Sequence, residues 1–137
     1  MTLAQKAVSV VSVLALMACA TMAGKNVDVT LSGAEEVPPV STPARGGGSF
    51  TIGDDGSVSG SVTTSGVEGT MAHIHQGARG QNGPVIVPLT KNGNTYSAPA
   101  GAKLNEAQMA AFKAGNLYVN VHSAANKGGE VRGQLNP

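Results

Sequence analysis

The feature that most constrains the fold of this chain is a series of short runs in which apolar and polar residues alternate, separated by glycine-rich turns. The first run places Val27, Val29 and Leu31 on one face of a strand. Turn signals recur between the runs, for example Asp54-Asp55-Gly56 and Asn92-Gly93. Many short strands of this kind predict an all-β fold, an antiparallel β-sandwich or barrel. We expect strands at residues 27–32, 49–52, 58–64, 68–77, 84–90, 116–123 and 129–135, with a further short strand after the second turn.

A single short helix is expected within this β structure, at about residues 105–114. Asn105 is a suitable N-cap, and Gln108 follows it at the spacing of a capping box. Phe112 lies on the short apolar face of this segment, and Gly115 is placed to end it. We expect the helix to cover one end of the sandwich or barrel.

Composition limits the functions that are open to this chain. A length of 137 residues suggests one domain after removal of any targeting segment. The formal net charge is +1, basic residues are not clustered, and the sequence has no Trp and only 2 Phe and 2 Tyr. Nucleic-acid binding, which relies on a basic surface and often on aromatic stacking, is therefore not expected.

The N-terminus has the pattern of a secretory signal peptide, which we assign to residues 1–18. Lys6 precedes an uncharged stretch from Ala7 to Ala18. This stretch is long enough for the core of a signal peptide and too short to span a membrane. We therefore expect export to the periplasm or the outer membrane of a bacterium, or otherwise secretion.

Two processing routes fit the end of this segment. Ala18-Cys19-Ala20 satisfies the small-x-small rule of the ordinary signal peptidase. Leu16-Met17-Ala18-Cys19 resembles a bacterial lipobox, in which Cys19 is lipidated and becomes the mature N-terminus. We favour the lipoprotein, with residues 19–26 as a tether, residues 27–137 as the domain, and membrane contact only through the lipid anchor. Cys19 is the only cysteine, so a disulfide within one chain is excluded.

Four stretches of the sequence together resemble the CHRD domain, which is named for chordin and is widespread in bacterial secreted proteins. They are LSGAEEVPPV, AHIHQGARGQNGPVIVPL, LNEAQMAAFKAGNLYVNVH and GGEVRGQL, in this order along residues 27–136. The resemblance implies an immunoglobulin-like or superoxide-dismutase-like β-sandwich. It supplies no firm biochemical function for the bacterial members, and the growth-factor binding of chordin does not transfer to a one-domain exported protein.

The chain has three histidines, and all of them fall on the polar side of their strands. His73 and His75 alternate with Ala72 and Ile74, so the two imidazoles share one face. His122 alternates with the apolar residues of a later strand and faces its polar side. If these two strands are neighbours in the sheet, the three imidazoles converge.

Three histidine ligands with an open fourth position suit Zn²⁺ or Cu²⁺, so the pattern predicts a copper or zinc site. Glu35 and Glu130 are candidates for an additional oxygen ligand, or for a hydrogen-bond acceptor behind the ligands. Met71, on the same face as His73, would add a soft thioether ligand for Cu(I). The alternative interpretation is that the histidines are solvated or hydrogen-bonded and hold no metal.

Other residues that resemble catalytic groups have ordinary structural explanations. Asp54 and Asp55 belong to a turn, where such residues are common. A copper–zinc dismutase also carries a His-x-His on a sandwich strand, but three histidines cannot build its dinuclear centre. Glu35 and Glu36 are expected to be solvated, with Glu35 pairing with Arg132.

These observations favour a non-catalytic envelope module that binds a metal ion. The alternative is a structural domain, or an interaction domain for an extracytoplasmic protein or glycan, without a metal. A mononuclear redox enzyme is the less favoured interpretation, because no partner that would orient a general base or nucleophile is identifiable from the sequence.

Overall fold

The structure, a computed structural model, describes residues 23–137. The predicted signal peptide and Cys19 lie outside the described residues, so export and lipidation stay predictions. The first strand begins at Gly24, ahead of the domain start expected at residue 27. The strands are β1 (Gly24–Ser32), β2 (Arg45–Gly53), β3 (Val58–Ser65), β4 (Gly69–Gln76), β5 (Val85–Pro88), β6 (Thr90–Asn92), β7 (Thr95–Ser97), β8 (Leu117–Ser123) and β9 (Val131–Leu135). The helices are the short 3-10 helix η1 (Gly33–Glu35) and α1 (Glu106–Lys113).

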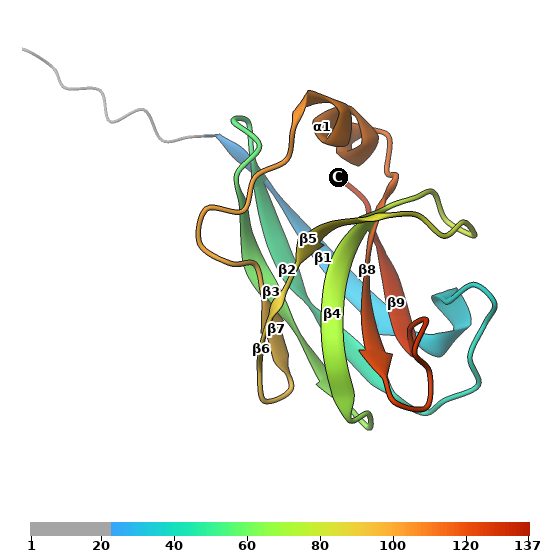
Figure 1. The fold of residues 1–137 in the computed structure, drawn as a ribbon. Coiled ribbons are helices and arrows are strands. Elements are labelled where there is room, and N and C mark those ends of the chain that lie inside the picture. Colours follow the sequence, from blue (N-terminus) through green and yellow to red (C-terminus); the bar gives the residue numbers. More distant parts are fainter. Residues whose placement is uncertain (1–22) are drawn as a thin grey trace, which may run out of the picture.

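All nine strands belong to one antiparallel sheet with the order β5-β4-β8-β9-β1-β2-β3-β7-β6. The two outermost strands, β5 and β6, are consecutive in the chain and are separated only by Leu89. The Leu89 N–H donates to the Ala72 carbonyl of β4, at 3.0 Å. The sheet therefore curls into a nearly closed barrel, which confirms the expected all-β class (Figure 1).

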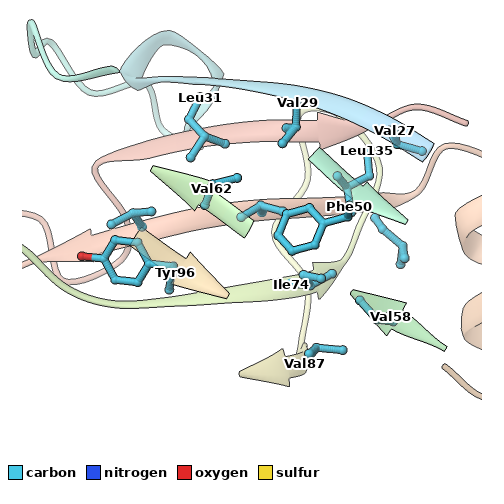
Figure 2. Packing of buried hydrophobic residues seen from close by; sticks show 14 of the residues in the cluster. Val27, Val29, Leu31, Phe50, Val58, Val62, Ile74, Val87, Tyr96 and Leu135 are labelled. Atoms are coloured by element: carbon cyan, nitrogen blue, oxygen red, sulfur yellow. The ribbon is translucent and has the colours of Figure 1, made fainter. Parts of the chain in front are cut away.

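The inner face of the sheet carries the hydrophobic core. Val27, Val29 and Leu31 are buried there, as the alternation in the first strand predicted. Figure 2 shows Phe50 and Ile74 pointing from different strands into the same space. Most of the buried side chains are aliphatic, as expected for a chain with so few aromatic residues.

Strand boundaries differ from the predicted ones where the sequence pattern is weak. β2 begins at Arg45, because the glycines at 46–48 belong to the strand although they carry no side chain that could show alternation. Gly48 fits there because a Cβ atom would overlap the Ser61 carbonyl of the neighbouring strand. The single strand expected at residues 84–90 is divided into β5 and β6, where the chain passes from one edge of the sheet to the other.

The expected helix is confirmed as α1, which lies across one end of the barrel (Figure 1). The capping box is present: the Gln108 N–H donates to Asn105 Oδ1 at 2.8 Å, and the Asn105 N–H donates to Gln108 Oε1 at 2.9 Å. Phe112 is buried and anchors the helix to the core. Within residues 23–137, no helix combines the length and the apolar character needed to cross a membrane.

The outward face of β4, β8 and β9 is covered by loops, and this cover positions the candidate site. Every residue of β8 and β9 is buried, so their outward side chains are shielded as well as their inward ones. The covering connections are residues 36–44, 77–84 and 124–130, which Figure 1 shows gathered beside these strands. A layer of buried polar side chains therefore lies between the sheet and the loops.

Candidate metal centre

The three histidines project outward from two adjacent strands. His73 and His75 lie on β4, where Ala72 and Ile74 point into the core between and beside them. His122 lies on β8, which pairs with β4 along almost its full length. The facing predicted from strand alternation is thus confirmed, and so is the adjacency of the two strands that convergence required.

The ligand atoms of the three imidazoles all lie within 4.8 Å of one another. The closest pair is His73 Nδ1 and His122 Nε2, which are 3.0 Å apart. Two nitrogens bound tetrahedrally to one zinc ion, each at about 2.0–2.1 Å, are separated by about 3.3 Å. The closest pair is therefore already near the spacing of metal ligands, and the third imidazole lies within 4.8 Å of both.

Backbone carbonyl groups behind the site select the tautomer of two histidines. His75 Nδ1 lies 2.9 Å from the Gly83 carbonyl oxygen, and His122 Nδ1 lies 2.8 Å from the Lys127 carbonyl oxygen. A carbonyl oxygen can only accept, so each Nδ1 carries a proton and donates it. Each Nε2 is then left with a free lone pair, which is the arrangement that holds metal-binding histidines in place.

The lone pairs selected in this way have different surroundings. His122 Nε2 accepts a hydrogen bond from His73 Nδ1. His75 Nε2 is buried and has no hydrogen-bond partner among the residues that the structure describes. A buried acceptor without a partner costs about 1–3 kcal/mol, so this atom marks a position that a cation or a donor would stabilise.

The electrostatics of the centre favour the neutral forms of His73 and His75. Burial lowers the pKa of His73, and the neighbouring His122 and His75 lower it further. Burial also lowers the pKa of His75, although its hydrogen bond to the Gly83 carbonyl acts in the opposite direction. Neutral imidazoles are the form that binds metal ions, so these two residues are ready to act as ligands at neutral pH.

An aromatic stack fixes the plane of His75. Its ring lies parallel to the Tyr118 ring, with an interplanar angle of 3° and centroids 4.7 Å apart. Arg132 covers the same tyrosine, with its Cζ 3.4 Å from the ring centroid. Because β4 and β9 flank β8 on opposite sides, the histidine and the arginine sandwich Tyr118 between them. The Tyr118 hydroxyl also accepts from the Gly83 N–H at 3.0 Å, which ties the stack to the covering loop.

One side of the centre is open to solvent. His73 is partly exposed, whereas His75 and His122 are buried. Met71 lies directly opposite His122 in the β4–β8 ladder and is 51% exposed. An ion would therefore enter past Met71 and His73.

The two predicted carboxylate ligands lie outside this group of three histidines within the described part of the chain. Glu35 forms an ion pair with Arg79, with 2.7 Å between Oε2 and Nη1, so the expected pairing of Glu35 with Arg132 is wrong. Both oxygens of Glu130 are occupied, because Thr42, Ser123 and Asn126 donate to them. The hydrogen bond from Ser123 lowers the pKa of Glu130, and this carboxylate joins two of the covering loops.

Sequence reasoning missed how deeply several charged residues are buried. Glu36 was expected to be solvated, but its side chain is only 4% exposed and lies beside Asn120 and Arg132. Burial raises its pKa to about 7, and hydrogen bonding to Asn120 and the charge of Arg132 only partly oppose the rise. The residues that follow it, Val37-Pro38-Pro39, do not indicate burial. Whether a loop folds over a residue depends on distant parts of the chain and not on the local sequence.

The raised pKa of Glu36 predicts a measurable dependence of stability on pH. The folded protein holds the proton of this group between the unfolded pKa, about 4.5, and the folded pKa, about 7. Stability from this group is therefore fully present below pH 4.5 and is lost as the pH rises through 7. Glu36→Gln, which imitates the protonated form, is expected to be more stable than the natural protein at pH 8 by up to about 3 kcal/mol, and nearly equal to it at pH 4.

Urea unfolding at both pH values tests this expectation. Glu68→Gln, a change at an exposed carboxylate, is the matched control and should alter stability little at either pH. A difference between Glu36→Gln and the natural protein that is the same at pH 4 and pH 8 would contradict the raised pKa.

Comparison with protein families gives one result. The model of the CHRD domain matches residues 27–135, which include nearly all of the barrel and all three histidines. Comparisons with curated proteins and with solved structures returned no match. The family match covers most of the sequence, in agreement with the resemblance seen in its four motifs, and the chain belongs to the CHRD domain family.

Proposed function

We propose that this protein is an exported, non-catalytic CHRD module that binds one Zn²⁺ or Cu²⁺ ion through His73, His75 and His122. Export rests on the signal-peptide pattern of residues 1–18, and the lipid anchor rests on Cys19. In this role the protein would hold a transition metal outside the cytoplasm, in the cell envelope.

The observation that carries the metal assignment is the unpartnered Nε2 of His75. This atom is buried, and it belongs to a group of three histidines whose ligand atoms all lie within 4.8 Å of one another. The carbonyls of Gly83 and Lys127 hold the Nδ1 protons of His75 and His122, so Nε2 is the nitrogen that each of them can offer to a cation. For His122 this requires the cation to displace the proton that His73 Nδ1 donates. Histidines that are only solvated would not need carbonyl groups to fix their tautomers.

The donor set decides which class of metal fits. Imidazole nitrogens suit zinc and copper, whereas Mg²⁺ and Ca²⁺ prefer an all-oxygen site. The cluster contains no thiolate, and the soft sulfur of Met71 lies at its solvent side. Zn²⁺ and Cu²⁺ are therefore the two ions to test first.

Isothermal titration calorimetry of the chelator-treated protein with Zn²⁺ and Cu²⁺ tests the proposal. We expect one equivalent to bind, and we expect the variant His73→Ala/His75→Ala/His122→Ala to lose this binding. Asp28→Ala/Asp54→Ala, which removes two exposed carboxylates, should retain it and so measures any contribution of surface acids. Equal weak binding by the natural protein and the histidine variant would refute the metal function and favour a module for protein or glycan partners.

A further inference from the structure

The residue at the centre of the histidine cluster is Asn120. It lies on β8 directly opposite His73, and it shares the outward face of that strand with His122. Its side chain is only 2% exposed. Any ion held by the three histidines would therefore sit close to the amide group of this residue.

The amide nitrogen of Asn120 is directed away from the histidines. Nδ2 donates to the Gly128 carbonyl, at 3.3 Å, and the Glu36 carboxyl group lies on the same side. Gly129 packs against this end so tightly that a Cβ atom would overlap both Asn120 Nδ2 and Glu36 Oε1. Reversing the amide would place Oδ1 against the Gly128 carbonyl oxygen, which can only accept, so this contact favours the orientation with Nδ2 toward the loop.

The amide oxygen of Asn120 is left facing the centre without a donor. Within residues 23–137, Asn120 Oδ1 is a buried atom with no hydrogen-bond partner, and so is His75 Nε2. On the outward face of β8, Asn120 lies opposite His73 and next to Tyr118, the residue opposite His75. Two neighbouring buried lone pairs repel each other and each lacks a partner, a double cost that a metal cation between them would remove.

We infer that Asn120 Oδ1 is the fourth ligand of the metal ion, so that the centre is a closed site of three nitrogens and one oxygen. This inference rests on the proposed metal function and deepens it. A tetrahedral zinc site with four protein ligands has no position for substrate, whereas catalytic zinc sites keep one open. The chain therefore holds its ion instead of presenting it to a reactant.

The fourth ligand also affects the choice of metal. A neutral amide oxygen is a hard donor, which suits Zn²⁺ and Cu²⁺ better than Cu(I). Met71, the soft donor, then lies outside the ligand set at the exposed rim. The centre should retain copper in its divalent form in preference to the monovalent one.

Binding of an external anion distinguishes a closed site from an open one. We would load the protein with Co²⁺, titrate it with azide, and follow the visible absorption of the metal. The natural protein should show no change, because all four positions are occupied, while Asn120→Leu should show an azide-dependent spectrum. A natural protein that binds azide as readily as the variant would overturn the inference.

Zinc affinity supplies the second measurement. Asn120→Leu is expected to bind Zn²⁺ about 10- to 100-fold more weakly, a loss of the size seen when groups that support a metal site are removed. Asn120→Asp, which keeps an oxygen at this position, should bind at least as tightly as the natural protein. Gln134→Leu is the matched control: it removes another buried amide of the same outward layer, one that donates to Gly77 and Gly115, and it should leave affinity unchanged.

The outcomes separate this inference from the function on which it rests. Zinc binding by the natural protein with equal affinity in Asn120→Leu would overturn the role of Asn120 and leave the three-histidine site standing. No zinc binding by the natural protein would refute the metal function itself. Should Asn120→Leu fail to fold, the azide titration of the natural protein alone still decides whether the site is closed.

Discussion

Replacing Arg132 with alanine is expected to lower the free energy of unfolding by about 3–5 kcal/mol. The side chain is only 1% exposed, and it donates to the Ala78 carbonyl at 3.0 Å and to Asn82 Oδ1 at 3.4 Å. Its removal would leave a cavity over the Tyr118 ring and would leave the Ala78 carbonyl without this donor. It would also remove the positive charge that acts on the buried Glu36.

The buried charge of Arg132 has no ion-pair partner among the described residues. In the described part of the chain the only ion pair joins Glu35 and Arg79, so no carboxylate lies within 4.0 Å of the Arg132 guanidinium. Carbonyl and amide oxygens and an aromatic face solvate it instead. Arg132→Met, which retains most of the volume, should therefore cost less than Arg132→Ala, and the comparison separates packing from polar contacts.

Urea unfolding at pH 7 measures both losses. Arg45→Ala is the matched control, because this arginine is exposed and its removal should change stability by no more than about 0.5 kcal/mol. A loss below about 1 kcal/mol for Arg132→Ala would show that the loops over the sheet do not depend on this residue.

Zinc is expected to stabilise the folded protein by about 2.7 kcal/mol at a free concentration 100 times Kd, and by about 4.1 kcal/mol at 1,000 times Kd. The reason is mass action, because the histidines are assembled into one site only when β4 and β8 are paired. Thermal unfolding at several free zinc concentrations, with a chelator as reference, measures the effect. The histidine triple variant should show none of it.

The pH dependence of this stabilisation has a definite sign. Protons compete with zinc for the imidazoles, so the stabilisation must shrink as the pH falls. The pKa values of His73 and His75 are lowered, so these two ligands stay neutral to a lower pH than ordinary histidines do. Mg²⁺ is the control ion. Equal stabilisation by Mg²⁺ and Zn²⁺, or stabilisation that grows on acidification, would be inconsistent with ligation by histidine.

Alternation in the sequence was sufficient to predict the facing of the histidines. Side chains on a strand point to opposite faces with a strict period of two, so the burial of Ala72 and Ile74 dictates that His73 and His75 point outward. The same reasoning placed His122 on the outward face of the later strand. The chemistry of the cluster thus follows from a steric rule that acts within each strand.

The convergence of the three histidines could not be predicted from strand alternation. β4 and β8 are distant in the chain, and their pairing depends on the order of all nine strands. The carbonyls that orient His75 and His122 belong to Gly83 and Lys127, and any residue type supplies a carbonyl. Sequence chemistry therefore indicates which residues can bind, while topology decides whether they meet.

The covered outward layer was the largest omission of the sequence prediction. Glu36 and Arg132 are charged residues of types that are usually solvated. Both are buried because loops distant in sequence fold over the sheet. The role of Asn120 was missed for a related reason, since an asparagine on a polar face gives no indication that its oxygen lacks a donor.

The alternation on β4 has one more consequence. Ala72 and Ile74 belong to the core, and His73 and His75 belong to the histidine centre. The core and the centre therefore share the backbone of β4 but no side chains. Substitutions at sites without shared partners act almost independently. Evolution could therefore exchange the ligands for other residues, or discard the metal altogether, while the interior of the barrel stays as it is. On β4, the residues that could carry chemistry are thus separate from those that build the core.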